Sequence, residues 1–174
     1  MSIEPFWVQI REPTLRQGDL LPGCLVPMPG PDSLLESRSE QGTAVEYDLV
    51  VLTQCCDLEQ GKVRLVATCP IFPIAEFEAV NPAFTSKGRW NEVLKGRVEG
   101  LHLLASPTAL DDNRQALVVD FREIYSLPID YLTNHVSRLG VRWRLKSPFL
   151  EHFSQAFARF FMRVGLPSTI PEFR

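Results

Sequence analysis

Two short apolar segments separated by a polar stretch dominate the hydrophobic pattern of the chain. Residues 49–53 are a nearly continuous run of Val and Leu, which is typical of a strand buried on both faces. In residues 63–68, apolar and polar positions alternate, as expected of a half-buried strand. The residues between them include Asp57 and Gly61, which favour turns. We therefore predict an antiparallel strand pair joined by a turn at residues 54–62.

Further short apolar segments predict more strands. Residues 18–26 are bounded by turn residues, and Pro22 argues against a central place in a sheet. Residues 27–42 are crowded with Pro, Gly, Ser and Glu, which predicts a long mobile loop. Later strands are expected at residues 101–105, 116–121, 123–126 and 141–145. Together these segments predict a mainly β fold.

The clearest helix is predicted near the C-terminus. Ser147 is expected as its N-cap, Pro148 as its first residue, and Gly165 as its end. Helical spacing places one apolar and aromatic stripe on it, typical of core packing or of a protein interface, at Phe149, Leu150, Phe153, Phe157, Phe160, Phe161 and Val164. Shorter helices are predicted at residues 85–98, with Ser86 as N-cap, and at residues 128–136.

Length and composition favour a single domain spanning residues 1–174. The chain has 174 residues, of which 45% are hydrophobic, enough to form one buried core. No apolar run approaches the roughly 20 residues that cross a bilayer, and no export signal is evident. We expect a cytoplasmic protein without membrane contact.

The net charge of −3 argues against a protein whose main task is to grip phosphate backbones. The charge is uneven: residues 1–87 hold 6 Lys and Arg against 12 Asp and Glu, whereas residues 88–174 hold 12 against 9. The densest basic run is Arg138, Arg142, Arg144 and Lys146. Strand alternation predicts that Arg142 and Arg144 share one solvated face.

The turn at residues 54–62 carries the first candidate chemistry, with Cys56, Asp57 and His102 as candidate catalytic residues. A thiol nucleophile needs a lowered pKa, which the adjacent Asp57 opposes and which His102, Lys62 or Arg64 would restore. The competing interpretation is that the cysteines pack as small hydrophobes and that Asp57 caps the turn.

Metal binding is the second candidate chemistry. The four cysteines Cys24, Cys55, Cys56 and Cys69 are too few for a disulfide scaffold and are expected to be reduced. Cys55 or Cys56 with Cys69, Asp57 and His102 would offer ligand types for zinc, but the paired Cys spacing of zinc sites is missing. We predict no metal and no cofactor.

Candidate binding residues lie in two places. Gln54 and Arg64 flank the predicted turn, and Arg89 and Trp90 combine a basic and an aromatic side chain within the segment at about residues 75–99. Such a combination suits a single-stranded nucleic acid, but an amphipathic helix that packs on the sheet is the more common reason for it. His135 and His152 stand alone in the sequence.

The order of these segments resembles the MazF/PemK family of bacterial toxin endoribonucleases. Residues 17–20 (QGDL) are similar to the opening "GD" strand of that family, residues 49–53 (LVVLT) to its "PVVVLS" strand, and residues 69–71 (CPI) to its "API" strand. Residues 117–124 (LVVDFREI) resemble its "VLVDQIRTV" strand, and residues 145–167 its closing helix. The resemblance implies a twisted antiparallel SH3-like barrel, with a helical insertion at about residues 75–99 and a C-terminal amphipathic helix.

The same resemblance implies that the ribonuclease machinery is missing. The family uses an arginine just before the "PVVVLS" strand and a Ser or Thr just after "API", where this chain has Tyr47-Asp48 and Phe72. We therefore expect a catalytically diverged protein- or nucleic-acid-binding component in a bacterial toxin-antitoxin or defence setting, able to form a homodimer as family analogy suggests. The alternative is an enzyme with a Cys/Asp/His site at residues 54–61. The run VVLTQxCDL is also similar to that of uncharacterised bacterial proteins.

Overall fold

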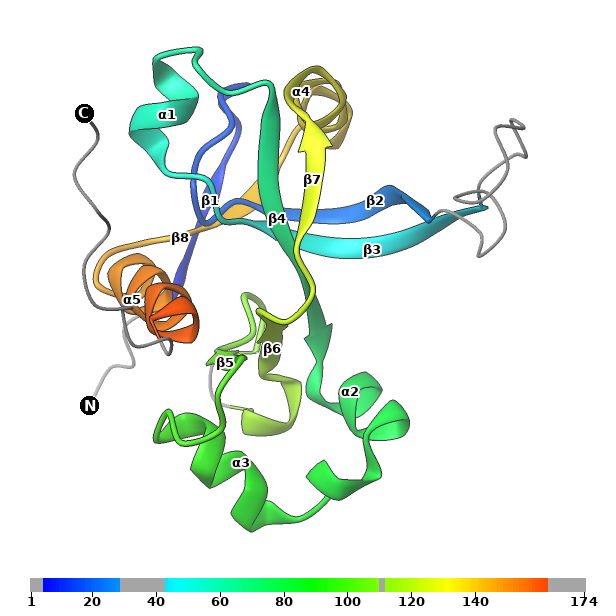
Figure 1. The fold of residues 1–174 in the computed structure, drawn as a ribbon, viewed down its shortest axis with the longest axis vertical. Coiled ribbons are helices and arrows are strands. Elements are labelled where there is room, and N and C mark those ends of the chain that lie inside the picture. The colour runs from blue at the N-terminus through cyan, green and yellow to red at the C-terminus, as the bar shows by residue number, and fades with distance from the viewer. Residues whose placement is uncertain (1–4, 29–42, 110–111, 163–174) are drawn as a thin grey trace, which may run out of the picture.

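The computed structural model describes residues 5–28, 43–109 and 112–162 (Figure 1). The strands are β1 (Trp7–Ile10), β2 (Leu20–Met28), β3 (Thr43–Val51), β4 (Leu65–Pro73), β5 (Leu101–Leu104), β6 (Leu117–Asp120), β7 (Tyr125–Pro128) and β8 (Arg142–Leu145). The helices are α1 (Cys55–Glu59), α2 (Ile74–Val80), η1 (Pro82–Phe84), α3 (Lys87–Leu94), η2 (Asn113–Gln115), α4 (Ile129–Leu139) and α5 (Phe149–Phe161). Most of the predicted loop at residues 27–42, and the predicted helix stop at Gly165, lie outside the described residues.

The main sheet is antiparallel throughout, as the apolar pattern predicted. Its strand order is β2-β3-β4-β6-β5, and β7 pairs with the first half of β4. The predicted strand pair is confirmed, since Leu49 lies opposite Pro70 and Val51 lies opposite Thr68 in the β3–β4 ladder. β2 stands at the end of the strand order, and its ladder with β3 is irregular between Leu21 and Cys24, around Pro22.

The sheet is open, so the predicted closure into a barrel is wrong, although the antiparallel sheet with peripheral helices is confirmed. β4 changes partner along its length: residues 65–68 pair with β7 and residues 71–73 pair with β6. Strands β1 and β8 form a separate two-stranded ribbon, which an isolated bridge between Asp19 and Arg144 links to the chain just before β2. Helices and strands contribute equally to the fold.

Residues 54–62 differ from the predicted turn because they contain the short helix α1. Gln54 is its N-cap and makes no side-chain capping bond, and Leu58 is its one buried residue. Asp57 lies in the first turn of α1, where a carboxylate is favoured by the helix dipole. β1 is a second element that the hydrophobic pattern did not predict.

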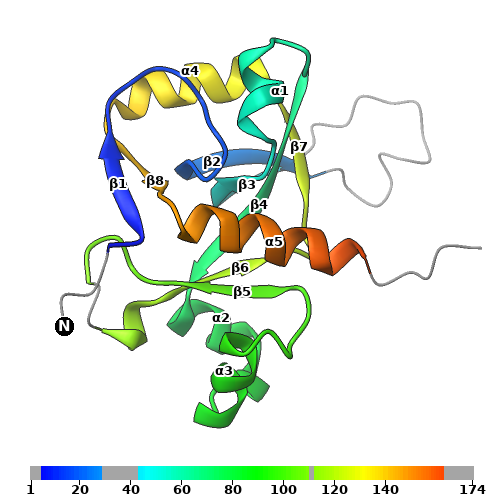
Figure 2. The ribbon, with the colours of Figure 1, turned by 90° about the vertical axis from the view of Figure 1, so that its left-hand side faces the viewer.

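Helix α5 seals one face of the sheet (Figure 2). Its Phe153 is fully buried in a cluster with Phe121, Leu104 and Val119, and the rings of Phe121 and Phe153 lie 5.6 Å apart. Phe149, Leu150, Phe157 and Phe160 of the predicted stripe also pack on this core, whereas Phe161 is exposed and Val164 lies outside the described residues. The helix begins one residue later than expected, with Pro148 rather than Ser147 as N-cap.

The predicted helical segment at about residues 75–99 consists of α2, η1 and α3. Phe77 and Val93 form a small core there with Leu101 of β5 and Val118 of β6. This part of the chain lies at one end of the molecule, and α1 and α4 lie at the other (Figures 1 and 2). In the described part of the chain, no helix has the length and apolar character needed to cross a membrane.

The predicted solvated face of Arg142 and Arg144 is wrong. Arg142 is 3% exposed, and its guanidinium donates to the buried Asp19 and to the backbone carbonyls of Glu12 and Thr14. Arg144 also pairs with Asp19 and with Glu12. Alternation did place both arginines on one side of β8, but the segment before β2 covers that side.

Candidate functional site

A cavity lies between α5, β5 and the turn that joins α3 to β5. It has a volume of about 510 Å³, within the usual range for ligand pockets. A second cavity of about 200 Å³ shares Val93, Leu94, His102 and His152 with the first. Together the two cavities form one groove along β5, which we call the α5 groove.

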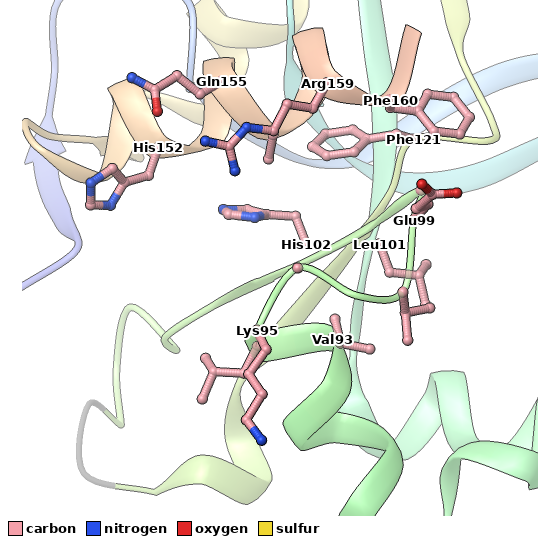
Figure 3. Close-up of a pocket in the computed structure, with 15 residues that line it drawn as sticks. Val93, Lys95, Glu99, Leu101, His102, Phe121, His152, Gln155, Arg159 and Phe160 are labelled. Atoms are coloured by element: carbon pink, nitrogen blue, oxygen red, sulfur yellow. The ribbon is translucent and has the colours of Figure 1, made fainter. Parts of the chain in front are cut away.

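One wall of the α5 groove is a polar stripe of α5. His152, Gln155 and Arg159 follow one another at helical spacing, so they project from the same side of the helix. Figure 3 shows these side chains extending from α5, with His102 of β5 on the other side of the cavity. All three α5 residues are exposed, and His102 is half-buried.

The four polar side chains share one property. In the described part of the chain, no hydrogen bond or ion pair engages the side chain of His102, His152, Gln155 or Arg159. The three side chains of α5 are solvent-exposed, so their polar groups are available to a ligand that enters the groove. The groove thus offers a guanidinium, an amide and two imidazoles to a ligand.

The opposite wall is mainly apolar. Val93, Leu94 and Leu101 line it, and Phe121 and Phe160 close one end. The ammonium of Lys95 turns away from the cavity and lies 3.7 Å from the Glu92 carboxylate (Figure 3). Glu99 contributes a carboxylate on the Phe160 side of the groove, whereas the guanidinium of Arg159 lies over His102 (Figure 3).

His102 titrates abnormally in this setting. Burial lowers the pKa of its imidazole to about 4, and the nearby His152 adds to the effect. Its ring lies 6.1 Å from those of Phe121 and Phe153, which explains the poor solvation of the charged form. His102 is therefore neutral at pH 7, and its imidazole has one N–H donor and one nitrogen acceptor to offer a ligand.

Gly100 shapes the end of the groove where β5 begins. Its φ is +85°, and a Cβ there would lie 3.2 Å from the Phe160 ring and 2.9 Å from Arg122. Only glycine adopts this backbone conformation without strain while allowing so close an approach. The turn from α3 can therefore pass beneath Phe160 and enter β5.

The candidate catalytic residues Cys56, Asp57 and His102 are not brought together. Cys56 and Asp57 are exposed on α1, whereas His102 lies on β5 at a distance from that end of the molecule (Figures 1 and 2). Within the described residues, the Cys56 thiol lies 3.7 Å from the side-chain oxygen of Gln54, to which it donates a hydrogen bond. Neither Cys56 nor Asp57 lines the groove.

The candidate binding residues also separate into two places. Gln54 and Arg64 are exposed beside α1, while Arg89 and Trp90 belong to α3 at the other end of the molecule. Trp90 is half-buried, and its indole donates to Glu78 at 2.8 Å. The guanidinium of Arg89 lies 5.2 Å from the centre of the Phe84 ring. Both α3 residues are thus engaged by the insertion's own core.

The remaining thiols lie apart from the groove. Cys24 and Cys69 are buried, and burial raises the pKa of both thiols, to about 12 for Cys24. Within the described ranges, no group of three or more His, Cys, Asp or Glu side chains has an arrangement that would hold a metal ion. Thiols of this kind behave as small apolar side chains.

The residues expected from the sequence resemblance to stand at the MazF/PemK catalytic positions have structural partners. Asp48 accepts a hydrogen bond from the backbone N–H of Gly23 at 2.9 Å, where the β2–β3 ladder is irregular. Tyr47 packs against Tyr125, with ring centres 5.3 Å apart. Phe72 packs against Phe77 of α2. These side chains hold the sheet and the insertion in place.

Sequence reasoning missed Gln155 and Arg159 and treated His152 as isolated. The available signal was the spacing of three polar residues at positions 152, 155 and 159, beside the aromatic stripe of the same helix. That signal also describes any solvated helix face, so it does not identify a site. The cavity becomes visible only when β5 and α3 are placed opposite α5.

Comparison of this chain with protein-family models, with curated proteins and with solved structures gives no match.

Proposed function

We propose that this chain is a binding module that captures an acidic segment of a partner protein in the α5 groove. The observation that carries this proposal is the set of four polar side chains that line the groove and make no hydrogen bond or ion pair within the described residues. Arg159 supplies a cation, and a carboxylate is the acceptor that a guanidinium binds in two-point geometry. Gln155, His102 and His152 add further N–H donors around it.

Several features favour a protein partner over a nucleic acid. The net charge of the chain is −3, and the ammonium of Lys95 is already close to Glu92. A phosphate backbone is gripped by several cations along its path, whereas the groove offers Arg159 as its single unengaged permanent cation among the described residues. Trp90, the expected stacking platform, is engaged by Glu78 and by the insertion core.

The module is proposed to be a catalytically diverged relative of the MazF/PemK toxins that lacks their ribonuclease activity. Support comes from the positions where that family carries its arginine and hydroxyl, because Asp48 and Phe72 have structural contacts there. The setting we infer from the resemblance is the cytoplasm of a bacterium, in a toxin-antitoxin or defence context. We do not propose the thiol enzyme, since no described cation or histidine partners Cys56.

A peptide selection tests this function. The full chain is immobilised and a phage-displayed library of random peptides is selected on it, with an Arg159→Glu variant and an Arg138→Glu variant in parallel. Arg138 is a matched control because it is an exposed helical arginine on α4. The expected result is enrichment of Asp- and Glu-rich peptides on the wild type and the control, and its loss on Arg159→Glu.

Three outcomes would contradict the proposal. Enrichment that does not depend on Arg159 would place binding elsewhere on the molecule. Binding of a pooled single-stranded RNA library that Arg159→Glu abolishes, with no peptide selected, would make the partner a nucleic acid. A dimer in sedimentation that Arg159→Glu dissociates would mean that a second copy of this chain fills the groove.

A further inference from the structure

The outer edge of β5 runs along the α5 groove and pairs with none of the strands in the described part of the chain. β5 is the last strand in the order of the main sheet, and its inner edge pairs with β6. The residues of β5 that line the two cavities are Leu101, His102, Leu103 and Leu104. The groove is therefore walled by α5 and α3, with a strand edge along its base (Figure 3).

The hydrogen-bond pattern of β5 and β6 fixes which backbone groups face outward. The N–H of Phe121 donates to the carbonyl of Gly100 at 2.7 Å, so these two residues form a hydrogen-bonded pair. In an antiparallel ladder such pairs alternate with non-bonded pairs. In the observed register, the next bonded pairs are His102 with Val119 and Leu104 with Leu117. The N–H and carbonyl groups of Leu101 and Leu103 must then point away from β6.

An independent contact supports this parity. The residue that continues the outward series is Ala105, and its carbonyl accepts a hydrogen bond from the indole of Trp7 at 2.7 Å. Trp7 belongs to β1, outside the ladder of β5 and β6. Where β5 ends, the outward carbonyl of Ala105 is thus hydrogen-bonded by a side chain. At Leu101 and Leu103, the outward N–H and carbonyl groups have no strand partner among the described elements.

We propose that the partner segment binds as an added β-strand on the outer edge of β5. The strand would bond to the N–H and carbonyl groups of Leu101 and Leu103 and direct acidic side chains toward Arg159. This inference rests on the proposed function and specifies how the same groove recognises its partner. Strand addition gives affinity through the main chain and specificity through pockets for alternate side chains.

The shape and charge of the groove fit such an occupant. Side chains of an added strand alternate between its two faces, so one set would meet the polar stripe of α5 and the other the apolar wall of α3. An acidic residue in the first set would meet Arg159, and apolar residues in the second would meet Val93 and Leu94. The inference therefore commits to an extended segment in which acidic and apolar residues alternate.

Amide hydrogen exchange on the full chain tests the binding mode, with a peptide from the selection as the probe. Saturating peptide is expected to slow exchange of the Leu101 and Leu103 amides at least tenfold. The His102 and Leu104 amides serve as internal controls, because β6 already protects them. Peptides N-methylated at successive positions should lose binding with a period of two.

The failures of the two proposals are distinguishable. Unchanged exchange at Leu101 and Leu103, with binding that still requires Arg159, would overturn strand addition and leave the acidic-segment proposal standing. Failure to select any acidic peptide would overturn both. A Leu103→Pro variant adds a further check, since proline removes an outward N–H without removing a bond to β6. It should fold as the wild type does and bind at least tenfold more weakly; wild-type binding by this variant would contradict strand addition.

Discussion

The guanidinium of Arg142 lies 2.9 Å from the carboxylate of Asp19, and both side chains are almost completely buried. This pair joins β8 to the segment before β2. Among the described strands, a single isolated bridge between Asp19 and Arg144 is the β pairing between these two parts of the chain. Arg142 also donates to the carbonyls of Glu12 and Thr14, so each nitrogen of its guanidinium makes a hydrogen bond. The pair thereby holds the β1–β8 ribbon against the main sheet.

Replacing Arg142 with methionine should be strongly destabilising. The substitution leaves Asp19 buried with Arg144 as its remaining cationic partner, and breaking a buried pair costs roughly 3–5 kcal/mol. We expect a loss of about 3 kcal/mol in the free energy of unfolding, measured by urea denaturation. Arg138→Met is the matched control and should change stability by less than about 0.5 kcal/mol. Equal stabilities of the two variants would contradict the role of this pair.

His102 should make the stability of the protein depend on pH. Because burial lowers its folded pKa to about 4, the unfolded chain binds a proton more readily than the folded chain between that value and about 6.5. This contribution to stability is complete above about pH 6.5 and is lost as pH falls toward 4. Solvent in the groove reduces its size, and we expect about 2 kcal/mol.

The comparison of wild type with a His102→Phe variant isolates this effect from the titration of carboxylates. Phenylalanine preserves the contacts with Phe121 and Phe153 and removes the titrating group. Urea denaturation at pH 4.5 and pH 7 should show a smaller loss of stability on acidification for the variant. Identical losses in the two proteins would mean that His102 does not titrate below its normal range.

Asp48 is predicted to have a structural role and no part in RNA cleavage. Asp48→Ala removes the acceptor for the Gly23 N–H, and a loss of about 1 kcal/mol is expected. The wild-type chain should not cleave a mixed RNA substrate in a gel assay. RNA cleavage by the wild-type chain that a single substitution abolishes would contradict the prediction that ribonuclease activity is absent.

Cys56 and Asp57 are predicted to be dispensable for partner capture. Both side chains are exposed on α1, away from the α5 groove, so a Cys56→Ala/Asp57→Ala variant should change stability by less than about 1 kcal/mol. Binding of a selected acidic peptide, followed by fluorescence anisotropy, should match that of the wild type. Loss of peptide binding in a folded variant would contradict this prediction and would mean that the thiol or carboxylate of α1 takes part in binding.

The strands other than β1 could be predicted because their apolar residues are local signals. Val50 and Val51 are fully buried, as a continuous Val/Leu run predicts, and β3 and β4 pair as expected. The open form of the sheet could not be predicted in this way. It depends on which strands pair, since β2 and β5 stand at opposite ends of the strand order, and periodicity carries no information on partners.

The candidate site was harder to predict because its residues are ordinary in sequence. Arg142 and Arg159 are the same residue type in the sequence. In the structure, Arg142 is buried against Asp19, whereas Arg159 is exposed at a cavity. His102 was singled out, but its neighbours proved to be Phe121, Phe153 and the polar side of α5 rather than Cys56. Such differences depend on contacts between segments that are distant in the chain.

The most direct measurement of the central claim is a charge exchange between the groove and its ligand. A selected acidic peptide and a copy of it with Lys in place of each Asp and Glu are titrated into the wild-type, Arg159→Glu and Arg138→Glu proteins, with affinity measured by fluorescence anisotropy. We predict that Arg159→Glu weakens the acidic peptide at least tenfold and strengthens the Lys copy, while Arg138→Glu alters neither. Equal responses of the two variants would contradict capture of an acidic segment in the α5 groove.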